Sequence, residues 1–354
     1  MQTVNFESIV HSIPKWLTPE GAQSEIVISS RARLARNIEG LPYAHRAHDS
    51  KLGDVVNNVL DVSGAAGFDR SDFFYNDGLN DYKKDVFIER HLISPTLAQK
   101  NGSRGVLVKN GEHDSILINE EDHLRIQSLR SGFDLLGAWE EADNIDDNLS
   151  KGIKFSFSSE YGYLTACPTN FGTGLRASIL IHLPALVLTK EIQRVIRSVS
   201  QLGLAVRGYR GEGTDVVGNL FQISNQTSLG KNERDIVNNL CSVVNQIIDY
   251  EKKAKDTLLK EAGKQIEDKI WRSLGILKTA RVLSSHEFMN LNSAIRFGHY
   301  LELIDKPGLK TLNELMILVQ PGHLQALQGR FVEPAERDVI RAEIVRQRFI
   351  DVRI

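Results

Sequence analysis

The pattern of apolar and polar positions divides the chain into a β-rich part and a helical part. After Gly105, short apolar runs alternate with polar or glycine-containing turns, which is typical of strands joined by tight connections. After Gly230, apolar residues recur at helical spacing. The predicted strands are 25–29, 106–108, 115–118, 153–157, 161–166, 177–183 and 219–224, and 124–129 is predicted as another strand or as the start of a helix.

Two pairs of neighbouring runs predict β-hairpins. Asn110-Gly111 separates the first pair, and this dipeptide favours the backbone of a tight hairpin turn. A short polar turn separates the runs 153–157 and 161–166. Because hairpins join antiparallel strands, we expect a largely antiparallel sheet with helices packed on it, and not a doubly wound parallel sheet.

The helical segments predict where one domain ends and the next begins. Helices are expected at 54–62, 191–202 and 232–261, where apolar residues fall on one face. Residues 1–24 predict an extension with a short docking helix that ends near Pro19. We expect a domain boundary near residues 255–263 and an all-helical region from 263 to 354, which Gly and Pro residues divide into pieces.

Composition identifies the class of protein without identifying its chemistry. With 354 residues, 41% apolar and 25% charged, the chain is typical of a globular protein, and its net charge of -2 does not favour nucleic-acid binding. Cys167 and Cys241 lie in unlike contexts, so a disulfide framework is not expected, and Cys241 is predicted to be core. There is no signal-like N-terminus or long apolar run, so we expect a cytoplasmic protein without membrane association.

Arginines recur beside glycines or acids where predicted strands meet loops. The five positions are Arg31, Arg33, Arg125, Arg176 and Arg207. Taken singly, each fits a solvated surface charge. Their recurrence at strand–loop junctions instead favours one site for a polyanion such as a nucleoside triphosphate.

An acidic run follows one of the hairpin strands. Glu120, Glu121 and Asp122 repel one another unless cations or protons relieve them. The run is either an exposed acidic turn or a source of a carboxylate that orients a guanidinium and accepts its proton. Glu212, between two glycines, is a candidate for a second carboxylate, because two carboxylates form a fork that suits a planar guanidinium. Together the arginines and acids indicate phosphoryl transfer to a basic group.

Two single residues and one group of three residues are further candidates. Cys167 precedes Pro168 and a glycine-rich turn, where a thiolate would be favoured and would support a cationic acceptor electrostatically. His91 is either a surface histidine or a residue that stacks on a nucleotide base. The group Arg337, Asp338 and Arg341 lies within one helical turn and fits a salt-bridged face.

Familiar nucleotide and metal motifs are missing from the sequence. There is no P-loop, no glycine loop or catalytic loop of ordinary protein kinases, and no dinucleotide fingerprint. Neither H-E-x-x-H nor a C-x-x-C pair occurs, so we expect no direct metal site. If phosphates bind, arginine side chains must hold them.

The arginine and acid segments, in this order, resemble the catalytic domain of phosphagen (guanidino) kinases, which include the creatine and arginine kinases. The match spans about residues 25–251 and rests on rare motifs such as Asn119-Glu120-Glu121-Asp122-His123-Leu124-Arg125. The resemblance implies an α+β, glutamine-synthetase-like fold in which helices flank a largely antiparallel sheet. It also implies ATP as donor, with Mg²⁺ held through the nucleotide phosphates. The roles it implies are nucleotide binding by Ser29, Arg31, Arg33, His91, Arg125, Arg176 and Arg207, base catalysis by Glu121, a second guanidinium clamp at Glu212, and a reactive cysteine at Cys167.

Two departures from the small-guanidino kinases narrow the resemblance. Those kinases carry a helical, lid-forming domain before the Ser-Ser-Arg segment, whereas 28 residues precede Ser29 here. The helical region 263–354 has no counterpart in them. This combination resembles the bacterial protein-arginine kinases of the McsB type, in which Arg337, Asp338 and Arg341 would match an allosteric phosphoarginine pocket.

We therefore expect three regions: an extension over 1–24, a kinase domain over 25–254, and a helical domain over 263–354 for phosphoarginine binding and dimerisation. The expected reaction is phosphorylation of arginine side chains in proteins. The alternatives are a kinase for free arginine or another small guanidino compound, and a non-catalytic adaptor that reads phosphoarginine. The resemblance further implies marking of proteins for a Clp-type protease, a zinc-binding activator protein, a stress-response repressor as substrate, and a homodimer.

Overall fold

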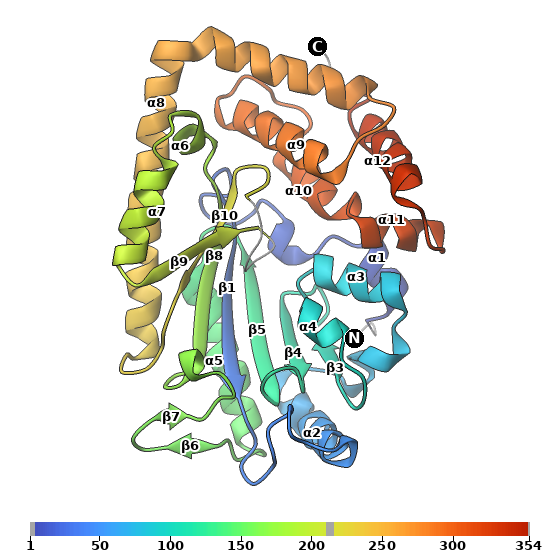
Figure 1. Cartoon of the computed structure of the whole chain (residues 1–354), viewed down its shortest axis with the longest axis vertical. Coiled ribbons are helices and arrows are strands. Elements are labelled where there is room, and N and C mark those ends of the chain that lie inside the picture. The colour runs from blue at the N-terminus through green and yellow to red at the C-terminus, as the bar shows by residue number, and fades with distance from the viewer. Residues whose placement is uncertain (1–3, 210–215, 353–354) are drawn as a thin grey trace.

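A large antiparallel sheet with helices around it forms the centre of the molecule (Figure 1). The structure is a computed structural model, and it describes residues 4–209 and 216–352. The eight strands lie in the order β2-β3-β4-β5-β1-β8-β10-β9. Their bounds are Phe73–Tyr75 (β2), Gly105–Val108 (β3), Asp114–Ile118 (β4), Leu124–Ser131 (β5), Val27–Arg36 (β1), Leu175–His182 (β8), Leu220–Asn225 (β10) and Leu204–Gly208 (β9). The antiparallel sheet expected from the hairpin signals is confirmed.

Helices surround this sheet and cover one of its faces. They are α1 (Phe6–His11), α2 (Asp49–Val62), α3 (Asp81–Glu89), α4 (Pro95–Ala98), α5 (Leu135–Ser150), α6 (Pro184–Leu188), α7 (Ile192–Gln201), α8 (Glu233–Thr279), α9 (Ser285–Tyr300), α10 (Leu309–Leu318), α11 (Pro321–Gln328) and α12 (Pro334–Arg348). Helices α5 and α8 pack against the central strands on one face. Figure 1 shows α9 to α12 together at one end of the molecule, across from α2.

Strand β1 shows how the two faces of the sheet acquire different characters. Side chains alternate between faces along a strand. Ala32 and Leu34 therefore point into the core that α5 covers, and both are fully buried. Arg31 and Arg33 point to the opposite face, which helices α5 and α8 leave open. The sequence predicted a strand only over 25–29, but the strand continues to Arg36.

Arg36 lies on the core side of β1, because it follows Ala32 and Leu34 at intervals of two residues along the strand. It is 1% exposed, and its Nη2 and Nε atoms donate to Asp146 Oδ2 of α5 at 2.7 and 3.0 Å. Its guanidinium also lies 3.4 Å from the ring centroid of Tyr163. This arginine therefore joins the sheet to α5 and takes no part in the open face.

Several elements were predicted and others were missed. The segment 124–129 is a strand, and the predicted hairpin at 153–166 pairs only β6 (Phe157–Ser158) with β7 (Gly162–Tyr163). The short strands β2 and β9 and the 16-residue helix α5 were not predicted. Among the described residues, none of the helices combines the length and the apolar character needed to cross a membrane.

The N-terminal segment is part of the core. Trp16 is 1% exposed and belongs to the main hydrophobic cluster, while Ile9 and Val10 of α1 pack in a second cluster with Phe87 of α3. A short helix is present, but α1 ends at His11 and not near Pro19, and a separate 3₁₀ turn follows at Lys15–Leu17.

One long helix connects the sheet region to the C-terminal helices. Helix α8 runs for 47 residues, and Ala262 breaks its helical geometry with φ -140° and ψ 25°. The kink lies within the boundary predicted near residues 255–263. The two sides remain in contact, because Arg296 donates to the Ser24 carbonyl at 2.6 Å and Asn313 donates to the Leu17 carbonyl at 2.7 Å.

His182 joins β8 to α9 and should make stability depend on pH. Its ring is 2% exposed and lies 2.7 Å from Ser293 Oγ, and burial together with Arg296 lowers its pKa well below 6.5. The unfolded chain then binds a proton that the fold does not. This contribution to stability is fully present above pH 6.5 and is lost as the pH falls toward the folded pKa, at about 1.4 kcal/mol per pH unit.

The test of this prediction compares the wild type with His182→Gln by urea unfolding between pH 7.5 and 5.5 (roughly the range in which histidine titrates). We expect the free energy of unfolding to depend less steeply on pH in the variant, by the amount that corresponds to the uptake of about one proton on unfolding. Equal slopes in the two proteins would contradict the assignment.

Candidate active site

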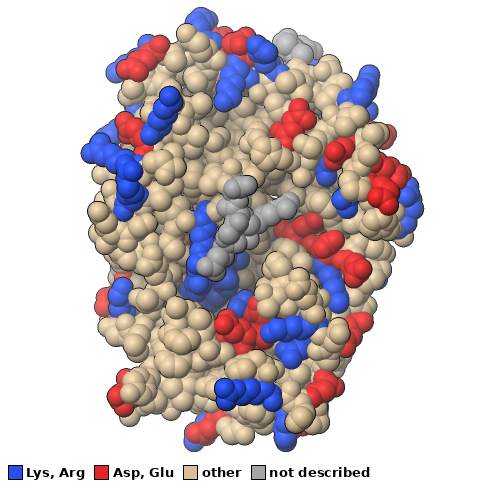
Figure 2. All heavy atoms as spheres, in the orientation of Figure 1, with Lys and Arg blue, Asp and Glu red and all other residues tan. Residues whose placement is uncertain are grey.

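A cavity of about 1050 Å³ opens on the face of the sheet that α5 and α8 leave uncovered. Figure 2 shows the hollow near the middle of this face, with basic side chains on one side and acidic side chains on the other. Strands β1, β5, β8, β9 and β10 form its floor, and α3, the start of α4 and the start of α11 contribute to its walls.

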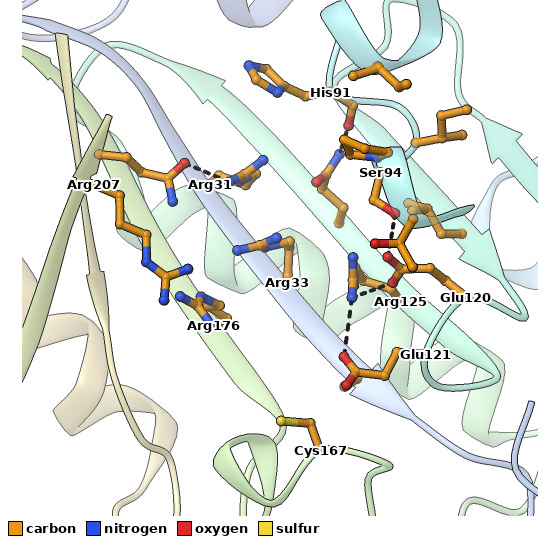
Figure 3. Close-up of a pocket in the computed structure, with 18 of the residues that line it drawn as sticks. Arg31, Arg33, His91, Ser94, Glu120, Glu121, Arg125, Cys167, Arg176 and Arg207 are labelled. Atoms are coloured by element: carbon orange, nitrogen blue, oxygen red, sulfur yellow. Dashed lines mark hydrogen bonds and ion pairs between the residues drawn. The ribbon is translucent and has the colours of Figure 1, made fainter. Parts of the chain in front are cut away.

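The five predicted arginines all line this cavity. They come from four strands: Arg31 and Arg33 from β1, Arg125 from β5, Arg176 from β8 and Arg207 from β9. Strand pairing places Arg33 directly opposite Arg176, and Arg207 opposite Gln222 of β10. Figure 3 shows the guanidinium groups of Arg31, Arg33, Arg176 and Arg207 directed toward a common space.

This concentration of positive charge is electrostatically unfavourable without an anion. Burial, followed by Arg125 and Arg176, lowers the pKa of Arg31 to about 10. Burial, followed by Arg31 and the other neighbouring arginines, also lowers the pKa of Arg33 well below its usual value. The Arg33 Nε atom is shielded from solvent and has no hydrogen-bond partner among the described residues. A bound polyanion would reduce the repulsion among the arginines and accept a hydrogen bond from Arg33 Nε.

Glu120 is a site residue that the sequence analysis did not single out. Its carboxylate forms an ion pair with Arg125 and accepts a hydrogen bond from Ser94 Oγ (Figure 3). Ser94 also caps α4, because its Oγ accepts the Leu97 amide at 3.0 Å. Glu120 is 5% exposed, so this pair fixes the direction of Arg125. The only sequence signal was its place in the acidic run.

Glu121 remains accessible, unlike its neighbours in the same run. Its side chain is 45% exposed, and its Oε2 lies 3.9 Å from Arg125 Nη2. Burial, followed by Asp122, raises its pKa above 4.5. Asp122 is buried and accepts the Asn37 side-chain amide and the Ala166 backbone amide, each at 2.6 Å. The acidic run therefore supplies one accessible carboxylate and two structural ones.

Cys167 lies in the same cavity as Glu121. The Asp122–Ala166 hydrogen bond holds the residue immediately before Cys167, and Figure 3 shows the sulfur at the Glu121 end of the arginine group. The Cys167 Sγ atom lies 3.0 Å from Thr169 Oγ1. Glu212, the predicted second carboxylate, lies outside the described residues.

His91 lines the cavity at its other end. Its ring lies 5.4 Å from that of Trp16 and 5.8 Å from that of Tyr209, and its carbonyl accepts Gln127 Nε2 at 2.8 Å. Burial, followed by Arg31 and Arg33, lowers its pKa to about 3, so the ring is neutral near pH 7. Ser29 is buried and does not line the main cavity; it borders a small neighbouring cavity of about 20 Å³ that shares Arg31 and His91 with the main one.

The C-terminal helices contribute to the cavity as well. Gln320 and Pro321, at the corner before α11, line the wall with Asp85 and Glu89 of α3. Burial and then Glu89 raise the pKa of Asp85, while Arg337 acts in the opposite direction. No sequence pattern had placed any of these residues at the site.

The predicted group on α12 divides into a buried anchor and a more accessible pair. Arg341 is 2% exposed, and its Nε and Nη1 atoms donate to the carbonyls of Val319 and Leu283 at 2.8 Å each. It also forms an ion pair with Asp338, whose side chain is 32% exposed. Arg337 is half-buried and acts electrostatically on Asp85. The Arg341–Asp338 ion pair agrees with the salt-bridged interpretation of the sequence, and the two carbonyl contacts give Arg341 a further structural role that the sequence did not indicate.

Comparison with known proteins places these features in one family. Residues 54–254 match the ATP:guanido phosphotransferase C-terminal catalytic domain, and residues 263–353 match the protein-arginine kinase McsB C-terminal domain. A protein-arginine kinase of Halothermothrix orenii is 44% identical over 337 residues, which cover 95% of this chain and 97% of that protein. One from Bacillus subtilis is 42% identical over 343 residues, covering 96% and 94%.

The fold has solved relatives too. A crystal structure of lombricine kinase aligns with a TM-score of 0.58 and 25% identity over 72% of each chain. The expected phosphagen-kinase fold is therefore confirmed. The two domain matches and the 44% identity over nearly the full length of a relative show that the chain belongs to the protein-arginine kinases of the ATP:guanido phosphotransferase family.

Proposed function

We propose that this protein transfers the γ-phosphoryl group of ATP to the guanidinium of arginine side chains in proteins. The observation that carries the proposal is the convergence of five arginines and the accessible Glu121 carboxylate in one cavity. The arginines suit the donor phosphates, and the carboxylate suits a guanidinium acceptor. The match of residues 263–353 to the protein-arginine kinase C-terminal domain favours a protein acceptor.

The arginines would bind and orient the triphosphate. Strands of one sheet carry all five arginines, so little reorganisation is needed when charge moves during transfer. Bound through the phosphate oxygens of ATP, Mg²⁺ would add to the neutralisation that the arginines provide. The neutral ring of His91, at the end of the cavity beyond Arg31, would contact the nucleoside part of ATP.

Glu121 would align the acceptor nitrogen and remove its proton. The new bond joins the guanidinium nitrogen to the γ-phosphorus, and the bond from that phosphorus to the β–γ bridging oxygen breaks, so ADP leaves with the electron pair. A free guanidinium is too weak an acid for a carboxylate, but its nitrogen becomes acidic as the N–P bond forms. The proton then passes to Glu121. Glu212 is proposed as the second carboxylate of the fork, and no phosphoenzyme intermediate is required.

Cys167 would support the acceptor electrostatically. Its sulfur shares the cavity with Glu121 and lies 3.0 Å from Thr169 Oγ1. We expect Cys167→Ser to lower kcat by about ten-fold, because the loss of one electrostatic contact with the acceptor costs roughly 1.4 kcal/mol. Steady-state assays at saturating ATP measure this, and complete inactivation would indicate a covalent role instead.

The reaction itself is tested by mass spectrometry. After incubation with ATP, Mg²⁺ and an unfolded basic protein, phosphoarginine that is labile to acid should appear on the substrate. Parallel assays with free arginine separate the proposal from the small-guanidino alternative. If only free arginine is phosphorylated, the protein-kinase assignment fails; if neither acceptor is phosphorylated while phosphoarginine binds, the non-catalytic adaptor is correct.

We also propose that Arg337 and Asp338 form a regulatory phosphoarginine site on α12. Asp338 would accept the guanidinium and Arg337 the phosphate, while Arg341 orients Asp338 through their ion pair. The expected result is that phosphoarginine changes the kinase rate of the wild type and leaves that of Asp338→Ala unchanged. Equal responses in the two proteins would remove the proposed site.

The family relationship extends the proposal to a cellular role. We propose that the protein acts in the cytoplasm as a homodimer, with a zinc-binding activator protein. Its products would mark proteins for a Clp-type protease, and a stress-response repressor would be among its substrates. Light scattering measures the oligomeric state, and addition of a Clp-type protease to phosphorylated and unphosphorylated substrate tests the marking. Degradation at equal rates would contradict it.

A further inference from the structure

The corner between α10 and α11 brings the C-terminal helices to the edge of the catalytic cavity. Gln320 and Pro321 at this corner line the cavity beside Asp85 and Glu89 of α3. Helix α11 reaches this position by packing closely on α3. A Cβ atom added at Gly322 would lie 2.7 Å from both Asp85 Cβ and the Val86 amide nitrogen, so a larger residue would push the helices apart.

Glu89 holds the start of α11 in this position. Its Oε1 accepts the Gly322 amide at 2.7 Å, and its Oε2 accepts the His323 amide at 3.0 Å. These are first-turn N–H groups that have no partner within their own helix, and the positive end of the helix dipole favours the carboxylate. Glu89 is the last residue of α3, two positions before His91, and it lines the cavity itself.

The contact continues through a buried histidine. His323 is fully buried, with Nδ1 2.7 Å from Glu89 Oε2 and Nε2 3.2 Å from Arg90 Nη1. Since a carboxylate only accepts and a guanidinium only donates, the ring carries its proton on Nδ1 and is neutral. Arg90 in turn makes a bidentate pair with Glu112 at 2.6 and 2.5 Å, which ties the network to the turn between β3 and β4.

A second arginine holds the other side of the corner. Arg341 of α12 donates to the Val319 carbonyl, one residue before Gln320, and to the Leu283 carbonyl before α9. The corner therefore lies between two charged residues, Glu89 of α3 and Arg341 of α12. Both contacts use backbone atoms of the corner or of α11, so they fix its position and not merely its side chains.

From these contacts we propose that Glu89 is a positioning residue for phosphoryl transfer, fixing the Val319–Pro321 corner as a wall of the catalytic cavity. The inference rests on the proposed kinase function but assigns a different task, since Glu89 neither binds phosphate nor takes a proton. The C-terminal helices thereby complete the cavity in which the acceptor must be aligned. Small displacements of such walls reduce the rate of transfer strongly, because alignment of the reacting atoms is lost.

Three variants test this role. Glu89→Gln keeps the size of the side chain but turns one of its two acceptor oxygens into an amide donor that faces N–H groups at the start of α11. Gly322→Ala introduces the close contact with α3, and Gly308→Ala is the matched control, because no atom lies within 4 Å of a Cβ at that position. We expect Glu89→Gln and Gly322→Ala to lower kcat by about ten-fold to a hundred-fold, with the KM for ATP within about two-fold of the wild type.

The outcomes are distinct. Amide hydrogen exchange without substrates should rise across the start of α11 in both test variants and stay unchanged in Gly308→Ala. The double variant should lose no more rate than the stronger single variant, because both disrupt one contact. The inference is overturned if both test variants keep kcat within about two-fold of the wild type. It is also overturned if the KM for ATP rises while kcat stays unchanged. Each rate is measured on protein and on free arginine, so a wild type active only on free arginine refutes the proposed acceptor and still tests Glu89.

Discussion

Replacing Glu121 by glutamine is expected to lower kcat by about 10³-fold and to leave the affinity for ATP nearly unchanged. Glutamine retains the size of the side chain but neither accepts the proton nor offers the negative charge that aligns a guanidinium. ATP affinity should persist because the phosphate-facing arginines are untouched, and Arg125 keeps its ion pair with Glu120.

The measurement combines steady-state kinetics with calorimetry of ATP binding. Glu160→Gln is a matched control, since Glu160 is an exposed acid in the turn between β6 and β7. In the wild type, the rate should also fall as the pH drops through a value above 4.5, because burial raises the pKa of Glu121 and only the carboxylate is active. Near-normal turnover of the variant would show that Glu121 is not the base.

Replacing Arg33 and Arg36 separately by methionine is expected to give opposite results, although the two residues lie three apart on one strand. Arg33→Met should lower kcat/KM by about 10³-fold and leave the thermal midpoint unchanged or higher. The stability should not fall because the substitution removes a positive charge from beside Arg31, Arg125 and Arg176.

Arg36→Met should instead destabilise the protein by about 3–5 kcal/mol. It leaves the Asp146 carboxylate buried without the partner at 2.7 Å and removes the cation over Tyr163. Folded Arg36→Met should retain its KM for ATP, because Arg36 does not line the cavity. Differential scanning calorimetry and kinetics on both variants provide the measurement. Loss of activity without loss of stability in Arg36→Met would contradict this division of roles.

Much of the fold was predictable because its signals are local. The Asn110-Gly111 turn and the apolar runs on either side determine a hairpin whatever surrounds them, and β3 and β4 form it. Edge strands carry weaker signals: β9 is only five residues long, and three of its positions are half-buried. Helix α5 was missed although Ala138, Ala142, Ile145 and Leu149 are fully buried at helical spacing.

The site was predictable as a list of residue types and only partly as an arrangement. The arginines and the acidic run stood out by composition and order, and the cavity contains all five arginines together with Glu121. Their neighbours could not be found in this way. Glu89 and Gln320 are 231 positions apart and line the same cavity only because α11 packs on α3.

By itself, the sequence determined the chemical inventory of this protein: arginines for a polyanion, a carboxylate for a guanidinium, and a hairpin-rich sheet to carry them. The tertiary structure decided which copies of each residue type do which task. The alternation of β1 sends Arg33 to the cavity and Arg36 to the core. Burial and hydrogen bonding leave Glu121 accessible while fixing Glu120 and Asp122. The reason is physical, since the environment of a charged side chain depends on neighbours that the fold brings together from distant parts of the chain.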